Sequence, residues 1–498
     1  MKFRLAVLAL IAGFLSINVY SQSKAKPVIT NYSLKFKVGG LKDVDAYLGF
    51  HYGDKKYIKD TAHVNSNGEI EFTGKDTLEG GIYLFITPSK NFFEFVVNEP
   101  KIQLETDTLD LTGHVVVKKS AENTVWFEYM RTIAKMQKDM QPFNEVISKA
   151  DVDKESKEYK DAIAGRDKVT ESLNKFREDQ IKKNPDMLVS TLFKAMKDVD
   201  MKAVEKDTDK VKVANYFKEH YWDNVDLSDS RLIRTPVLES KITHYFDKVC
   251  YQIPDSLMIE CDRILKKTNG DKEMFKFILH HLTYVYERSQ IMCMDAVFVH
   301  LVDTYYKTGQ TPWVEQKTME KMLERAEKLR PNLCGKQVVN ISLPDTGGVF
   351  HSLYDFKGDY TILFFWDATC SHCKKSTPVL ADLYKTYLKP NGIEIFGVEG
   401  ELDDKEWKKY QAEQNLPWLN VSDNPEMNAN PEKWILELKK TDLNSLNFRH
   451  IFDLYSYPVV FVLDKQKRII GKKLGVEQIQ DFIEKYKKVQ ERKEKEKK

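Results

Sequence analysis

The stretch Phe364-Phe-Trp-Asp-Ala-Thr-Cys-Ser-His-Cys-Lys-Lys-Ser-Thr-Pro378 decides the fold of the C-terminal third of this 498-residue chain. The run that leads into it, residues 360–366, is almost wholly apolar, which predicts a strand buried on both faces. A short polar turn follows, and Cys370 stands where the next helix is predicted to begin. Cys373 comes one helical turn later, so the two sulfur atoms can approach each other.

The sequence after this stretch alternates between helical and strand patterns. The predicted helices cover residues 378–388 and 404–415, and the predicted strands cover residues 393–398 and 459–463. Apolar strands that alternate with helices indicate an α/β domain around a buried sheet, here over residues 335–487. The tail, residues 488–498, is almost all charged, and we expect it to fray or to stay disordered.

The position of Cys370 at a helix N-terminus favours its thiolate, because unpaired backbone N–H groups there attract negative charge. A protonated His372 would add a second positive influence beside that sulfur. An exposed Cys370 can then attack a substrate disulfide, and a more buried Cys373 can resolve the mixed disulfide. A structural zinc site would need two more ligands, and no second Cys/His pair lies near these cysteines in the sequence. Covalent haem attachment is excluded because its motif needs a histidine at the position of Lys374. A merely structural disulfide stays open as an alternative.

The quoted stretch resembles the active-site segment of thioredoxins, in particular the TlpA/ResA type of extracytoplasmic thiol–disulfide oxidoreductase. Pro378 matches the proline that bends the active-site helix in that family, and Pro458 matches its cis-proline, a role that needs proline. The resemblance covers about residues 335–487 and implies a thioredoxin-like fold. It implies catalytic roles for Cys370, Cys373, His372 and Pro458, and substrate-binding roles for Trp366, Thr369 and Tyr457.

Three positions depart from the family pattern. Thr369 stands where a tryptophan usually precedes the first cysteine, and Ser376 stands where the ResA type has a glutamate that can accept a proton from the resolving thiol. Asp367 and Glu399 are the candidate replacements for that base, and the spacing does not choose between them. A histidine between the cysteines resembles the strongly oxidising DsbA type, so the direction of electron flow stays open.

The residues before the redox domain predict two further domains, which makes the chain multidomain. Residues 26–119 alternate with period two and predict a small antiparallel β domain, with a hairpin signal at Asn67–Gly68. Residues 120–330 show helical spacing and predict an all-α domain. His244 and the pair His280–His281 lack a third ligand at diagnostic spacing, so we predict no metal site there.

The first residues predict a secretory signal peptide over residues 1–21. Lys2 and Arg4 precede a short apolar run, and small residues follow it. No later segment is apolar enough to span a bilayer, so we expect a mature chain without a transmembrane segment in the periplasm or cell envelope. Outside the redox pair, we expect Cys250, Cys261, Cys293 and Cys334 to be buried small residues, although a Cys250–Cys261 bridge is permitted.

These patterns predict an extracytoplasmic thiol–disulfide oxidoreductase that acts on protein disulfides, with reduction as the favoured direction. A reductant outside the cytoplasm needs electrons, so a membrane thiol-electron transporter is the implied redox partner. No cofactor is expected, and 77 basic against 75 acidic residues give no electrostatic case for nucleic acid. The alternatives are a thiol-dependent peroxidase and a client-binding envelope protein with an auxiliary redox domain.

Overall fold

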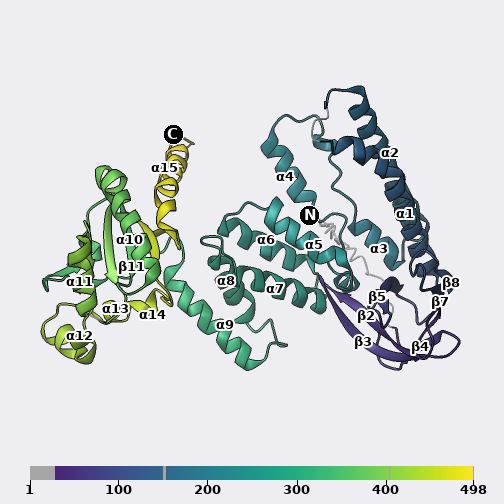
Figure 1. Ribbon diagram of the computed structural model, residues 1–498, viewed down its shortest axis with the longest axis horizontal. Helices are drawn as coiled ribbons and strands as arrows, with labels where there is room; N and C mark the ends of the chain where they lie inside the picture. Colours follow the sequence, from purple (N-terminus) through teal and green to yellow (C-terminus); the bar gives the residue numbers. More distant parts are fainter. Residues whose placement is uncertain (1–28, 150–152, 403, 497–498) are drawn as a thin grey trace, which may run out of the picture. The chain divides into compact units, whose positions relative to one another are not determined.

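The computed structural model describes residues 29–149, 153–402 and 404–496, and Figure 1 shows their helices and strands. The chain forms two compact units. The first contains the chain up to Val199 with Asp223–Val225 and Arg231–Lys241, and the second contains Asp200–Trp222, Asp226–Ser230 and the chain from Ile242 onward. The predicted signal peptide lies outside the described residues, and the domain boundaries expected from the sequence stay predictions.

Two four-stranded sheets, ordered β4-β1-β7-β8 and β3-β2-β5-β6, form the β part of the first unit. Their strands are β1 (Tyr32–Gly39), β2 (Val44–Tyr52), β3 (Lys55–Val64), β4 (Glu69–Gly74), β5 (Gly81–Ile86), β6 (Phe92–Val97), β7 (Lys101–Asp107) and β8 (Val116–Lys119). The period-two pattern buries Phe36 of β1 against Phe85 of β5, with ring centroids 4.9 Å apart. The predicted β domain is confirmed, with one parallel pair, β1 and β7, among antiparallel ones.

The turn at Asn67–Gly68 does not close a hairpin, so that interpretation was wrong. β3 pairs with β2 and β4 pairs with β1, which means that the chain crosses here from one sheet to the other. Gly68 has a φ of +77°, and a Cβ there would lie 2.6 Å from the carbonyl oxygen of Val38. The local turn signal was therefore sound, but the pairing of its strands depends on burial between the two sheets.

Helices dominate the chain between the sheets and the redox domain. They are α1 (Ala121–Ile147), α2 (Lys157–Lys183), α3 (Leu188–Ala195), α4 (Lys210–His220), α5 (Pro236–His244), α6 (Pro254–Lys267), α7 (Lys272–Glu287), α8 (Asp295–Leu301) and α9 (Gln316–Leu329). Pro236 and Pro254 are the first residues of their helices, where proline costs no backbone hydrogen bond. The buried Glu122 of α1 accepts hydrogen bonds from the free N–H groups of Leu188 and Val189 at the start of α3.

The four cysteines outside the redox pair divide into two kinds. Cys250 and Cys261 are free and buried, as expected, and the permitted bridge between them is absent. Cys293 and Cys334 form a disulfide, so the expectation of buried small residues was wrong for this pair. The bridge joins the loop before α8 to the segment after α9, and this pairing depends on a geometry that sequence spacing does not reveal.

The C-terminal domain is built on a five-stranded sheet with the order β13-β12-β11-β14-β15. Its strands are β11 (Tyr360–Trp366), β12 (Glu394–Glu399), β13 (Leu419–Val421), β14 (Val459–Asp464) and β15 (Ile469–Lys472), with a short hairpin of β9 (Ser342–Pro344) and β10 (Phe350–Ser352). β11 is parallel to β12 and antiparallel to β14. Its helices are α10 (Ser371–Leu383), α11 (Asp404–Gln414), α12 (Pro425–Ala429), α13 (Leu443–Leu446), α14 (Phe448–Ile451) and α15 (Ile479–Glu496).

Strand β11 separates two hydrophobic cores. Its even-numbered residues Ile362, Phe364 and Trp366 pack on one face with side chains of α10, α11 and α15. Its odd-numbered residues Leu363 and Phe365 pack on the other face with side chains of α12, α13 and α14. All five side chains have no exposed surface, which explains why the strand is apolar without alternation. The predicted thioredoxin-like α/β fold is confirmed.

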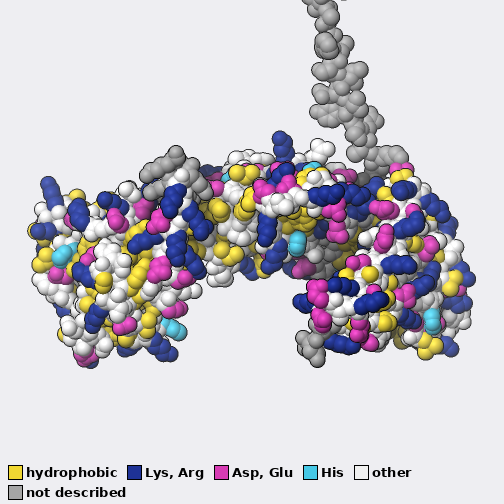
Figure 2. Space-filling view, turned by 90° about the horizontal axis from the view of Figure 1, so that it is seen from above, with side chains coloured by type: hydrophobic (Ala, Val, Ile, Leu, Met, Phe, Trp, Pro, Cys, Tyr) yellow, Lys and Arg dark blue, Asp and Glu magenta, His cyan; other side chains and the backbone are white. Residues whose placement is uncertain are grey.

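The charged tail, for which the composition predicts fraying or disorder, is helical as far as the structure describes it. Ile479 and Ile483 at the start of α15 are fully buried and anchor the helix on the sheet. Lys485 and Asp481, one turn apart, add a surface ion pair 2.7 Å long. Figure 2 shows acidic and basic side chains interspersed over the visible face. Within the described ranges, no helix combines the length and apolarity needed to cross a bilayer.

Replacing both Cys293 and Cys334 by serine is expected to lower the free energy of unfolding of the second unit by up to about 4 kcal/mol. The bridge links residues with a sequence separation of 41. Removing it raises the conformational entropy of the unfolded chain and so lowers the free energy of unfolding. Urea denaturation without reductant measures the change. Under reductant the two proteins should unfold at the same urea concentration, and a wild-type curve that is insensitive to reductant would contradict the expectation.

Candidate active site

The two cysteines predicted to form the redox pair, Cys370 and Cys373, lie at the junction between β11 and α10. Cys370 is the N-cap residue of α10 and is half-buried, whereas Cys373 is 1% exposed. The Sγ atom of Cys373 accepts a hydrogen bond of 3.4 Å from the backbone N–H of Asp367. Burial raises the pKa of Cys373 well above the ordinary thiol value. The sulfur of Cys370 at the helix N-terminus is therefore accessible, whereas the sulfur of Cys373 is shielded.

The loop before β14 closes over the first cysteine. Its Tyr457–Pro458 peptide bond is cis, as the resemblance implies. The Sγ atom of Cys370 donates a hydrogen bond of 3.5 Å to the carbonyl oxygen of Tyr457. The Tyr457 ring lies directly over Gly400, where a Cβ atom would come within 2.1 Å of the ring. A side chain at Gly400 would therefore displace the Tyr457 ring from this position.

Two buried carboxyl groups lie beneath the turn that carries the cysteines. Glu399 is 1% exposed, and its two oxygens accept the backbone N–H groups of Ala368 at 3.1 Å and of Glu401 at 2.8 Å. Burial raises the pKa of Glu399 to about 8, although these hydrogen bonds oppose the shift. Asp367 is 8% exposed and accepts the N–H and the hydroxyl of Thr369 at 2.6 and 2.8 Å. Both candidate bases therefore hold the backbone around the cysteines.

Arg449 is a site residue that the sequence did not suggest. Its guanidinium forms a bidentate pair with the fully buried carboxylate of Asp423, with both N–O distances 2.7 Å. Its Nε donates to the carbonyl oxygen of Gly400, which also accepts the Tyr457 hydroxyl at 3.2 Å. Arg449 thereby ties the loop of Tyr457 to the end of β12. These residues are far apart in the sequence, so no local pattern could have grouped them.

The remaining predicted residues differ in their access to a substrate. Trp366 has no exposed surface, and its indole N–H donates a hydrogen bond of 3.0 Å to the side chain of Asn420. It therefore packs beneath the site and cannot contact a substrate. Thr369 is exposed and Tyr457 is half-buried. The His372 side chain is exposed on the first turn of α10. No group of three or more residues arranged to hold a metal is found among the described residues.

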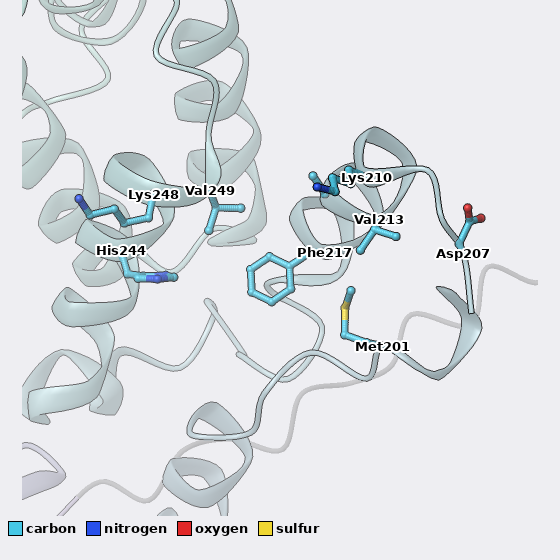
Figure 3. A pocket seen from close by; sticks show the side chains of 9 residues that line it. Met201, Asp207, Lys210, Val213, Phe217, His244, Lys248 and Val249 are labelled. Atoms are coloured by element: carbon cyan, nitrogen blue, oxygen red, sulfur yellow. The ribbon is translucent and has the colours of Figure 1, made fainter. Parts of the chain in front are cut away.

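A cavity of about 630 Å³ lies away from the cysteines, in the helical part of the second unit. Figure 3 shows its apolar side chains, which include Met201, Val213, Phe217 and Val249, with His244 beside them. The Nδ1 atom of His244 is 3.0 Å from the Tyr221 hydroxyl. The lining contains no cysteine, so it takes no part in the redox site.

Three family descriptions match separate parts of the chain. Residues 334–472 match the AhpC/TSA family, and this region holds both redox cysteines and the cis-proline. Residues 204–332 match a domain of unknown function, DUF5106, and residues 32–126 match another, DUF4369. The redoxin character of the C-terminal domain is thus supported independently of the fold.

Individual relatives are similar over parts of the chain. The thiol-disulfide oxidoreductase ResA of Bacillus subtilis is 41% identical over 64 residues, which are 13% of this chain and 35% of ResA. A thioredoxin-like protein from Bacteroides caccae is 21% identical with a TM-score of 0.40, over 54% of this chain and 92% of that one. A domain of a possible thiol-disulfide isomerase from Cytophaga hutchinsonii is 36% identical with a TM-score of 0.27, over 32% of this chain and 97% of that one.

Glu399→Gln is expected to weaken the pH dependence of stability. The pKa of Glu399 is about 8 in the folded chain, against an ordinary value of 4.5. Between these two pH values, Glu399 is protonated in the folded chain but ionised in the unfolded chain. The contribution of Glu399 is therefore fully present below the unfolded pKa and is lost as the pH rises through the folded pKa. Urea midpoints of the wild type should fall relative to those of the variant from about pH 5 to about pH 8.

The exposed neighbour Glu401 provides the control for this measurement. Glu401→Gln changes the same chemical group without removing a buried carboxyl, so its stability should follow the wild type across the same pH range. If Glu399→Gln also followed the wild type, the assignment of a buried, protonated carboxyl at this position would be refuted.

Proposed function

We propose that this chain, whose residues 334–472 match the AhpC/TSA family, is a thiol–disulfide oxidoreductase that acts outside the cytoplasm on protein disulfides. One observation carries the proposal. A half-buried cysteine at the start of a helix touches the carbonyl oxygen next to a cis-proline, and a buried cysteine follows it by one turn. This arrangement exposes the first sulfur to a substrate disulfide and leaves the second, buried sulfur to resolve the mixed disulfide.

In the reducing direction, the thiolate of Cys370 attacks a sulfur of the client disulfide. A bond forms between Cys370 and that sulfur, and the other client sulfur leaves as a thiolate, which takes up a proton. Cys373 then loses its proton and attacks Cys370, which releases the second client thiol and leaves Cys370 and Cys373 joined. Two electrons pass from the protein to the client. We assign the acceptance of the Cys373 proton to Asp367 or, once the pH exceeds the pKa of about 8 at which its carboxyl ionises, to Glu399.

The extracytoplasmic location rests on two features. The N-terminal residues have the composition of a secretory signal peptide, and Cys293 and Cys334 form a disulfide outside the redox pair, which suits an oxidising compartment. A reductant there needs electrons from across the membrane, so we propose a membrane thiol-electron transporter as its redox partner. The potential of the Cys370–Cys373 pair tests the direction. A value near −270 mV, that of thioredoxin, supports reduction, and a value near −120 mV, that of DsbA, supports oxidation.

Cys370→Ala is expected to reduce turnover of a protein disulfide such as insulin to the uncatalysed rate, because it removes the nucleophile. Cys373→Ala should instead trap the mixed disulfide, which mass spectrometry detects as an adduct that reductant releases. Cys250→Ala removes a free cysteine of the helical region and should retain turnover. Peroxide-dependent thiol consumption in place of insulin reduction would favour the peroxidase alternative, and unchanged turnover in Cys370→Ala would reject the proposal.

A further inference from the structure

A cleft of about 390 Å³ adjoins the cis-proline within the second unit. One wall belongs to the redox domain and includes Tyr455 and Pro458 from the loop before β14 and Lys473 after β15. The other wall belongs to the helical region and includes Arg325 and Leu329 of α9. Two regions of the chain that match different families therefore share this cleft.

Several contacts hold the helical wall against the redox domain. The buried ammonium of Lys472 pairs with Asp295 at the start of α8 and donates to the carbonyl oxygen of Asn332 at 2.6 Å. Arg325 pairs with Asp453 at 2.6 Å, and the Cys293–Cys334 disulfide ties the same region covalently. The helical wall is thus a fixed part of the cleft.

The charges of the cleft do not cancel. Lys472 is neutralised by Asp295 and Arg325 by Asp453, which leaves the fifth charged lining residue, Lys473. Its side chain is exposed, and within the described part of the chain it has no ion-pair partner. Tyr455, which lines the same cleft, is 77% exposed and offers an aromatic face. Among the lining residues, Lys473 is therefore the positive charge without an ion-pair partner, and Tyr455 is an exposed aromatic ring.

The lining of the cleft includes the residue that follows Tyr457, the contact of the reacting sulfur. The Sγ atom of Cys370 is 3.5 Å from the carbonyl oxygen of Tyr457, and the next residue, Pro458, lines the cleft. A polypeptide joined to Cys370 through its own cysteine advances about 3.5 Å per residue when extended. The residues that flank the client cysteine can then reach the cleft directly.

We propose that this cleft binds the client segment next to the reacting cysteine and that Lys473 favours an acidic residue in that segment. The inference rests on the proposed function and adds a substrate class to it. The helical region takes part by supplying a wall and by using Arg325 to neutralise Asp453, so that the charge of Lys473 is not offset.

Two short peptide disulfides that differ only in one residue near the cysteine, glutamate or lysine, test this preference with the full-length reduced protein. At low salt the glutamate peptide should react about three- to fivefold faster, as expected for one exposed ion pair. Lys473→Glu should reverse the ratio of the two rates. Lys465→Glu makes the same charge change in the exposed turn between β14 and β15 and should keep the wild-type ratio. At about 1 M salt, where the Debye length is about 3 Å, the ratio should approach one.

Arg325 tests the contribution of the helical wall. Arg325→Ala leaves Asp453 unpaired beside Lys473, so the glutamate preference should fall towards one, and Arg325→Lys should restore it. A ratio that is unaffected by Arg325→Ala would overturn the role of the helical wall, and equal rates of the two peptides with the wild type would overturn the acidic preference.

Two further measurements separate this inference from the proposed function. Peptides with serine in place of cysteine report binding to the full chain without redox chemistry, and here too the glutamate peptide should bind about three- to fivefold more tightly. A neutral small disulfide, bis(2-hydroxyethyl) disulfide, reports the redox pair without a flanking chain. Preferential binding without any disulfide turnover would reject the proposed function alone, whereas turnover without preferential binding would reject the cleft.

Discussion

The burial of β11 on both faces is the constraint on which the proposed redox site depends. Because each face of this strand belongs to a different hydrophobic core, the strand cannot slide or rotate without exposing aromatic side chains. Its last residue, Trp366, is fixed further by its hydrogen bond to Asn420. The turn that follows can therefore deliver Cys370 to one defined position at the start of α10.

A polar network fixes the other side of the site. Arg449, neutralised by the buried Asp423, holds the carbonyl group of Gly400, and Gly400 in turn accommodates the ring of Tyr457. Breaking one member of such a pair leaves a buried charge uncompensated, which is strongly destabilising. The core thus places the cysteines and the network places the loop above them, and neither alone would bring Cys370 and Tyr457 together.

Local patterns predicted the parts of the fold that depend on neighbouring residues. The apolar run of β11, the start of α10 and the helical character of the middle region were all visible in the sequence, and the family resemblance implied the cis-proline. The pairing of Cys293 with Cys334, the crossing at Asn67–Gly68 and the Arg449 network were not, because each joins residues that only tertiary packing brings together. The helical tail was missed for a related reason: composition favoured disorder, but two buried isoleucines at the start of α15 anchor it.

The disulfide between Cys293 and Cys334 gives this protein two pairs of cysteines with opposite requirements. One pair has to be oxidised once and then left alone, while the proposed activity requires the other to change state in every cycle. On the proposed function, the chain receives one disulfide when it matures and exchanges another when it works. Protein produced in a reducing cytosol would lack the Cys293–Cys334 disulfide beside the cleft even when Cys370 and Cys373 are intact. The properties of a preparation would then depend on the compartment in which it was produced.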